Sequence, residues 1–234
     1  MRVLSVDTAT ENATCAVIDD NTLLGEICIN YKKQHSVILM PMIDNLLNSL
    51  QMTLEDIDGY VVSKGPGSFT GLRIGMANIK ALSQGTNKPF ISVSSLDALA
   101  YNMAYTNHII CPILDALRGN VYTALYSFED NKLIKVSEYM TLSIEELVAI
   151  LKEKGTHVCF IGDGVTKYKD NLLSLLNNIS FAPTHLNLVR AASLGELGLE
   201  LLNSGIKDDL YEAAPIYLRK PQAEREYNKK MGLK

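Results

Sequence analysis

The chain has 234 residues, of which 47% are hydrophobic and 21% charged, with a formal net charge of −4. This length can bury a core in one domain or two small lobes, and the acidic balance argues against an independent nucleic-acid binder. The first strand-like run is interrupted at Asp7, unlike a signal peptide, and no apolar stretch approaches the roughly 20 residues that span a bilayer. We therefore expect a cytoplasmic protein without membrane contacts.

Two segments of the sequence share one order of predicted elements. The first reads LSVDTATENATCAVIDDNTLLGEICIN, and the second, from residue 111, reads CPILDALRGNVYTALYSFEDNKLIKVSEYM. Each segment predicts a strand that ends at Asp7 or Asp115, a polar turn, a second strand, an acidic turn and a third strand. An amphipathic helix (34–50 or 143–154) and a further strand follow in both cases. The repeat predicts an α/β fold with two related lobes around mixed sheets that face a cleft. The alternative is that hairpins of unrelated α/β proteins look alike.

The organisation of the chain follows from this repeat. We predict an N-terminal lobe over residues 1–106, a C-terminal lobe over residues 107–218 and a charged, fraying tail over residues 219–234. The second predicted helix opens on Ser143, with Glu146 three residues later, which is the pattern of a capping box.

A glycine-rich turn, GPGS at 65–68, follows the predicted strand 59–64 and opens a helix that runs to about residue 84. Ser68 is a suitable N-cap, and such a helix start can bind an anion. However, no Gly-Lys-Ser/Thr follows, and the glycine spacing differs from the dinucleotide fingerprint. The candidate cofactor-binding residues are therefore a hypothesis only: Asp7, Thr8, Gly65, Gly67 and Ser68.

Two apolar or small-residue stripes suggest close packing. Gly71 and Gly75 lie inside the predicted helix, where each costs about 1 kcal/mol relative to alanine. They predict an element packed against the backbone, either a strand of the same lobe or a helix of another subunit. An extra apolar stripe on helix 34–50 favours an interface. The predicted interface residues are His35, Val37, Met40, Leu47, Gly71, Gly75, Asn78 and Leu82.

Catalytic residues are harder to assign. Asp7 and Asp115, at predicted strand ends, could hold a metal or position a water, although capping of the following turn is the plainer role for Asp115. The GDG at 162–164 either contacts a nucleotide or forms a tight turn. The four histidines are far apart, without an HxxxH pair, and the cysteines lack zinc-site spacing. We therefore predict no catalytic residue and no metal site.

Six stretches, in order, resemble the TsaB family, also called YeaZ: VLSVDTATENATCAV, HSVILMPMIDNLL, GPGSFTGLRIGM, SVSSLDALA, LDALRGNVYTALY and APIYLR. The resemblance implies the two-lobed ASKHA fold of actin, heat-shock ATPases and sugar kinases, which is similar to ribonuclease H. The related TsaD transfers a threonylcarbamoyl group to tRNA and binds a metal with an HxxxH pair. Alignment of that pair with SVSSLDALA places Ser95 and Leu99 at the metal positions, and neither is a suitable ligand.

The resemblance also implies a function. It predicts a non-catalytic partner that binds TsaD through helix 34–50 and the helix after Ser68, and helps recruit the ATPase TsaE. The complex modifies N6 of the adenosine next to the anticodon in tRNAs that read codons beginning with A. This chain is expected to meet tRNA only through the complex, to form a homodimer alone, and to leave ATP or ADP mainly to its partners. The alternatives are an independent ATPase or phosphotransferase, which would use Thr10 besides the cofactor candidates, and a metallopeptidase.

Overall fold

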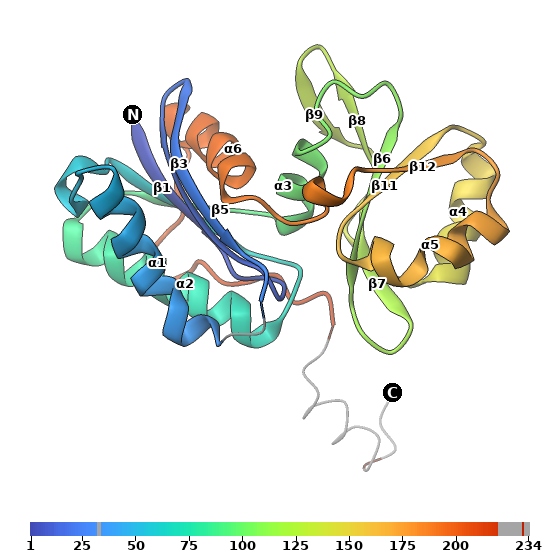
Figure 1. Cartoon of the computed structure of the whole chain (residues 1–234), viewed down its shortest axis with the longest axis horizontal. Helices are drawn as coiled ribbons and strands as arrows, with labels where there is room; N and C mark the ends of the chain where they lie inside the picture. Colours follow the sequence, from blue (N-terminus) through green and yellow to red (C-terminus); the bar gives the residue numbers. More distant parts are fainter. Residues whose placement is uncertain (32–33, 220–230, 232–234) are drawn as a thin grey trace.

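The first sheet has the strand order β3-β2-β1-β4-β5 in the computed structural model, which describes residues 1–31, 34–219 and 231 (Figure 1). Strands β1 to β3 are antiparallel, whereas β4 and β5 continue in parallel from β1. Their bounds are β1 (Arg2–Asp7), β2 (Ala13–Asp19), β3 (Thr22–Ile29), β4 (Gly59–Ser63) and β5 (Phe90–Val93). Strands β1, β2 and β4 are buried along almost their whole length, as in a sheet covered on both faces.

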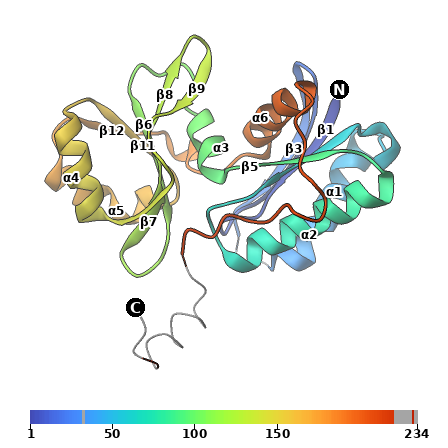
Figure 2. The same cartoon turned by 180° about the vertical axis from the view of Figure 1, so that it is seen from behind.

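Helices cover the two faces of this sheet. On one face, α1 (His35–Ser49) and α2 (Phe69–Thr86) lie side by side, and a short 3₁₀ helix, η1 (Leu54–Asp56), follows α1 (Figure 2). On the other face lies α6 (Ala191–Asn203), which contacts β1, β2, β4 and β5. The predicted helices 34–50 and 68–84 are therefore present within two residues of their expected ends.

The second sheet repeats this plan in the order β10-β7-β6-β11-β12. Its strands are β6 (Ile109–Asp115), β7 (Asn120–Thr123), β10 (Met140–Ser143), β11 (Val158–Ile161) and β12 (Ile179–Phe181), and the hairpin β8 (Tyr126–Glu129) and β9 (Lys132–Lys135) extends from it. Helices α4 (Ile144–Lys154) and α5 (Gly164–Leu175) pack on its outer face, and η2 (Thr184–Leu186) follows β12.

The predicted duplication is confirmed, with one elaboration. Strands β7 and β8 together correspond to β2, and β9 and β10 together correspond to β3, because β8 pairs with β9 and β7 with β10. The hairpin is interrupted near Leu125, whose amide donates to Ser137 Oγ at 2.8 Å instead of to a strand. The predicted capping box is also confirmed, since Ser143 N donates to Glu146 Oε2 at 2.8 Å and Glu146 N donates to Ser143 Oγ at 3.2 Å.

Helix α6 falls within the predicted C-terminal lobe, yet it packs on the first sheet. Gly195 and Gly198 allow this approach, because a Cβ would lie 2.7 Å from Ser5 Oγ at the first and 2.4 Å from Val61 Cγ1 at the second. After β12 the chain thus returns to the first sheet. The predicted lobe boundary at residue 106 had assigned this segment to the second lobe. The predicted tail lies outside the described residues except for Arg219 and Met231.

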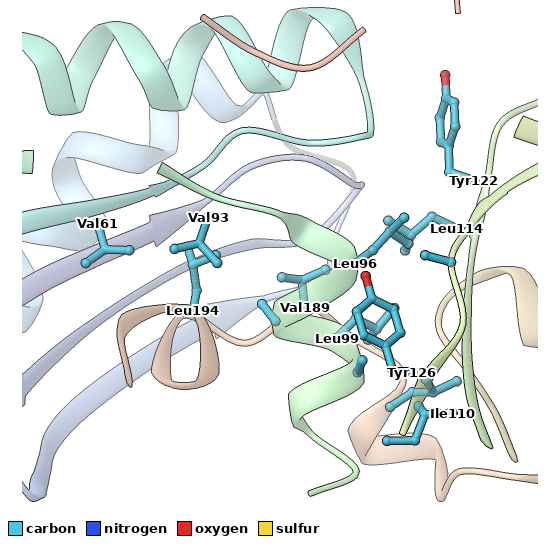
Figure 3. Close-up of a cluster of buried hydrophobic side chains, with 14 of the residues drawn as sticks. Val61, Val93, Leu96, Leu99, Ile110, Leu114, Tyr122, Tyr126, Val189 and Leu194 are labelled. Carbon is cyan, nitrogen blue, oxygen red and sulfur yellow. The ribbon is translucent and has the colours of Figure 1, made fainter. Parts of the chain in front are cut away.

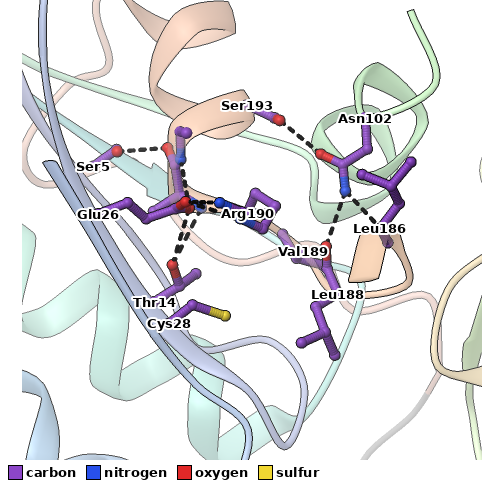
Figure 4. Close-up of polar contacts among 12 residues, drawn as sticks. Ser5, Thr14, Glu26, Cys28, Asn102, Leu186, Leu188, Val189, Arg190 and Ser193 are labelled. Atoms are coloured by element: carbon purple, nitrogen blue, oxygen red, sulfur yellow. Dashed lines mark hydrogen bonds and ion pairs between the residues drawn. The ribbon is translucent and has the colours of Figure 1, made fainter. Parts of the chain in front are cut away.

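Side chains of the first sheet cap the start of α6 (Figure 4). The N-cap residue Arg190 supplies no side-chain cap. Instead, Glu26 Oε1 accepts from Ala192 N at 3.1 Å, Glu26 Oε2 accepts from Arg190 Nε at 2.8 Å, and Thr14 Oγ1 accepts from Ala191 N at 3.4 Å. Arg190 is therefore paired with a carboxylate that is itself almost fully buried.

One continuous apolar core joins the two sheets (Figure 3). It contains the short helix α3 (Ser95–Tyr101) together with side chains of both sheets and α6: Val61, Val93, Leu96, Leu99, Ile110, Leu114, Tyr126 and Leu194. The lobes are thus packed together and not merely linked. None of the helices in the described part of the chain combines the length and apolar character needed to cross a membrane.

Candidate functional site: the inter-lobe cleft and the outer face of two helices

The glycine turn before α2 packs against the loop between β1 and β2. A Cβ at Gly67 would lie 2.3 Å from the carbonyl oxygen of Ala9, so only glycine fits there. Ser68 N donates to the same carbonyl at 2.7 Å, and Ser68 Oγ accepts from Gly71 N at 3.3 Å as the predicted N-cap. The turn therefore uses its glycine and its first amide to hold this chain's own backbone.

The two glycines inside α2 pack in the same direction. A Cβ at Gly71 would lie 1.9 Å from the carbonyl oxygen of Thr8, and one at Gly75 would lie 2.6 Å from Thr8 Oγ1. Thr8 Oγ1 also donates to the carbonyl oxygen of Gly71 at 2.8 Å. Of the two alternatives, the glycines thus pack against the same lobe, at Thr8, the first residue after β1. Both glycines are buried, which corrects their assignment to a partner interface.

The other predicted interface residues lie in different environments. Leu47 is buried in the core between α1 and the first sheet, so its assignment to the interface was wrong. Met40 and Leu82 pack partly against that core, and Asn78 Nδ2 donates to the carbonyl oxygen of Ile74 at 2.7 Å. In contrast, Val37 is 64% exposed. His35 Nε2 lies 3.3 Å from the carbonyl oxygen of Glu11.

Side chains on the solvent side of α1 and α2 form a surface that we call the outer α1–α2 face. It comprises Ser36, Val37, Thr70, Arg73, Ile74, Ala77, Asn78 and Ala81, several of which line a shallow groove along α2. On α2 these residues recur at intervals of three and four, as expected for one side of a helix. The exposed alanines leave the helix backbone accessible to another helix.

A cleft between the two lobes has a volume of about 1170 Å³. Of the predicted cofactor-binding residues, Gly67 and Ser68 line it. Asp7, Thr8 and Gly65 do not: Asp7 and Thr8 are buried, and Gly65 lies beneath Leu72 and the carbonyl of Ile216. Acidic and basic side chains from both lobes also line the cleft, together with the imidazole of His35: Glu11, Arg73, Asp115, Asp163, Lys167 and Arg219.

The acidic residues of the second lobe have partners within the cleft. Asp115 caps the following turn, as its plainer interpretation predicted, by accepting from Leu117 N at 3.0 Å, and it pairs with Lys167 Nζ at 3.1 Å. In the GDG segment, Asp163 Oδ1 accepts from Asp115 N at 2.9 Å, and burial raises the pKa of Asp163. Gly162 has φ +119°, so this segment forms a tight turn between β11 and α5.

The C-terminal segment contributes residues that the sequence analysis missed. Tyr217 stacks on Phe69 with ring centroids 4.6 Å apart, and its hydroxyl accepts from Arg73 Nε at 2.9 Å. Ile216 N donates to the carbonyl oxygen of Lys64 at 2.7 Å, and Arg219 donates to the carbonyl oxygen of Ala116 across the cleft. The motif APIYLR, noted only for its resemblance, was the available signal for these contacts.

The carboxylate of Asp7 is fully buried at the end of β1. Burial raises its pKa from 3.8 to about 6, and nearby donors, including the amide of Ala9, oppose the rise only in part. The native protein therefore holds this proton more tightly than the unfolded chain, so stability is lost as the pH rises through this interval.

We expect Asp7→Asn to abolish this pH dependence. Between about pH 4 and pH 7, the free energy of unfolding of the wild type should fall relative to that of the variant by up to about 3 kcal/mol, at 1.36 kcal/mol per pKa unit. Urea denaturation at both pH values measures the difference. Parallel pH profiles for the two proteins would show that Asp7 keeps its ordinary pKa.

Comparison with known proteins identifies the family. A family model described as TsaD, tRNA N6-adenosine threonylcarbamoyltransferase, matches residues 22–227. The tRNA threonylcarbamoyladenosine biosynthesis protein TsaB of Bacillus subtilis (strain 168) is 34% identical over 228 residues, which are 97% of this chain and 98% of that protein. The chain belongs to the TsaB family. The TsaB of Escherichia coli (strain K12) is 28% identical over 94% of this chain and 95% of its own length.

The solved structure of YeaZ from Pseudomonas aeruginosa has the same fold as this TsaB-family chain. Its TM-score is 0.78 at 22% sequence identity, with 93% of this chain and 99% of that chain covered. The predicted fold class, a duplicated two-lobed ASKHA-like α/β fold, is thereby confirmed.

Proposed function

We propose that this chain is a non-catalytic subunit of tRNA threonylcarbamoyladenosine biosynthesis, which binds a TsaD-type transferase and is required for its activity. The observation that carries the proposal is the full-length similarity to TsaB, combined with the residues at the metal positions of the transferase. Ser95 and Leu99 occupy those positions by alignment, and both side chains are fully buried. Contacts with TsaE, a homodimer of the free chain and a cytoplasmic location belong to the same proposal.

The metal site of the transferase does not fit this chain. Leu99 is part of the core that joins the lobes, and neither its side chain nor a buried serine supplies an imidazole. Within residues 1–31 and 34–219, no three His, Cys, Asp or Glu side chains are grouped in a way that could hold a metal ion. Histidines placed at both positions should therefore disturb the core without creating transferase activity.

The outer α1–α2 face is the surface that we assign to the transferase. It is the side of these helices that the chain's own sheet leaves exposed, and it combines apolar Val37 with the small residues Ala77 and Ala81. Small side chains permit close helix–helix approach, and the neighbouring Arg73 can contribute a rim contact. A four-helix contact with two helices of the partner suits this geometry.

The structure determines which variant tests this surface. Substitution of Gly75 by leucine would clash with Thr8 inside the lobe, so it would report on folding instead of docking. Ala77→Arg is the better choice because Ala77 is exposed on the outer α1–α2 face. Its matched control is Ala149→Arg, at an exposed position of α4 on the other lobe.

We expect Ala77→Arg to weaken binding to the transferase at least about 100-fold, because a buried unpaired charge costs several kcal/mol in an interface. Ala149→Arg should bind like the wild type. Calorimetric titration with purified transferase measures both affinities, and circular dichroism verifies that both variants are folded. Wild-type affinity of Ala77→Arg would exclude this face as the contact surface.

The functional test is tRNA modification in a reconstituted mixture of TsaD, TsaE and the adenylate-forming enzyme. We expect modification to require this chain, and we expect no activity when this chain replaces TsaD. Equal modification with and without it would overturn the proposal.

An independent ATPase is the second candidate, and the charged inter-lobe cleft is the observation that favours it. In that case the isolated chain should bind ATP and hydrolyse it. Equilibrium dialysis and phosphate release with the purified chain separate the two candidates.

A further inference from the structure

Three polar side chains meet at the carboxyl end of the first sheet, below the start of α3. Asp7 ends β1 and Ser63 ends β4, and these parallel neighbours pair Val6 with Val62, so the two residues follow side by side. Ser95 begins α3, and its amide donates to the carbonyl oxygen of Gly65 at 3.0 Å. Two strands and a helix thus bring one carboxylate and two hydroxyls to the same place.

All three side chains are buried, with exposed fractions of 0% for Asp7, 1% for Ser63 and 0% for Ser95. Asp7 Oδ2, Ser63 Oγ and Ser95 Oγ each have no hydrogen-bond partner among the described residues. Other polar atoms nearby are satisfied: Asp7 Oδ1 accepts from Ala9 N at 3.2 Å, and Ser94 Oγ accepts from Leu96 N at 3.2 Å. Two more buried hydroxyls without a partner among the described residues, those of Thr141 and Tyr168, belong to the second lobe, so these three atoms form the group in the first lobe.

An unpaired buried polar atom forfeits its hydrogen bonds to water, so three together would be a large penalty for a small lobe. The hydroxyls of Ser63 and Ser95 lie close enough to Asp7 to act as donors that lower its pKa against the effect of burial, but neither bond to Oδ2 has the distance and angle of a full hydrogen bond. A small polar group that contacts all three atoms at once would satisfy them.

We propose that Asp7, Ser63 and Ser95 enclose one water molecule. The water donates to Asp7 Oδ2, and the hydroxyls of Ser63 and Ser95 complete its hydrogen bonds. A buried water typically makes about three hydrogen bonds, which equals the number of unpaired atoms. A hard cation such as Mg²⁺ would bring several waters of its own to complete its octahedral shell, whereas the three unpaired atoms of this buried cluster match the hydrogen bonds of one water.

The proposed water has a structural consequence. It links β1, β4 and the first residue of α3, and α3 contributes Leu96 and Leu99 to the core shared by the two lobes. The hydration site thereby fixes where α3 begins relative to the first sheet, and with it the position of the second lobe.

A crystal structure of the full chain, at a resolution at which single waters are visible, tests the proposal. We expect one density peak within hydrogen-bond distance of all three atoms. The double variant Ser63→Ala/Ser95→Ala should lose this peak. The control variant Ser5→Ala should retain the peak. Ser5 lies on β1, as Asp7 does, but its hydroxyl already donates to the carbonyl oxygen of Ala191 at 2.6 Å.

Several results would overturn the proposal: direct hydrogen bonds from both hydroxyls to Oδ2 with no peak, a peak that persists in the double variant, or an anomalous signal from rubidium at the site. If the double variant does not fold, ¹⁷O relaxation dispersion of the wild type and of Ser95→Ala provides the second test. The single variant should have one long-lived internal water fewer, and equal numbers would contradict the assignment.

Discussion

The variant Gly71→Ala is expected to lose about 3 kcal/mol or more of its free energy of unfolding. Its new Cβ would lie 1.9 Å from the carbonyl oxygen of Thr8, which is backbone and cannot rotate away. Helix α2 would have to move from the end of β1 and would lose the 2.8 Å bond from Thr8 Oγ1 to Gly71 O. Overpacking of a rigid contact costs about 1–3 kcal/mol, and a backbone clash belongs at or above the upper limit.

The same helix supplies the control. A Cβ at Gly85 would meet nothing within 4 Å, and this position is exposed near the end of α2. Gly85→Ala should therefore stabilise the protein by about 0.5–1 kcal/mol, because alanine is the better helix former. Urea denaturation of both variants measures the contrast, and equal stabilities would refute the close approach of α2 to β1.

This contrast also shows what the sequence could and could not predict. The interior glycines correctly indicated that something packs against α2, because their cost in a helix has to be compensated. Whether Thr8 or another subunit occupied that space depended on the path of the β1–β2 loop, for which local sequence gives no signal. The assignment of Gly71 and Gly75 to a partner was wrong for this reason.

Hydrophobic periodicity had a similar limit. It located α1 within one residue at each end, yet it placed Leu47 on a second, exposed stripe. Two rows of apolar side chains on α1 are buried because this helix packs against both β2 and α2. Its buried face is therefore wider than contact with the sheet alone would require. Val37, at the first turn of the helix, lies beyond this contact and stays exposed.

The candidate cofactor-binding residues were also only partly predictable from the sequence. The sequence placed Asp7 and the glycine turn each at the end of a predicted strand, and in the structure these strands, β1 and β4, are parallel neighbours. Burial could not be predicted: Asp7 points below α3 instead of into the cleft, whereas Gly67 and Ser68 line it. Charged residues that line the cleft but are distant in the sequence, such as Arg219, can be located only from the tertiary structure.

The variant Glu26→Ala is expected to lose about 3 kcal/mol of stability. Glu26 is 5% exposed in its side chain, pairs with Arg190 and accepts from Ala192 N at the start of α6 (Figure 4). Removal of one partner from a buried pair costs about 3–5 kcal/mol, and we take the lower value because the Arg190 side chain is 35% exposed. The loss also leaves an amide of α6 without its cap.

The control for this prediction is a solvent-exposed ion pair of the same chain. Glu138 lies 3.6 Å from Lys135, with 91% of its side chain exposed, so Glu138→Ala should change stability by less than about 0.5 kcal/mol.

Because α6 completes the helical layer of the first sheet and belongs to the shared core, the loss in Glu26→Ala should affect both lobes in one cooperative transition. Hydrogen exchange distinguishes this from local fraying of α6: protection should fall in β1 and β6 together, and a loss confined to α6 would show that the lobes unfold separately.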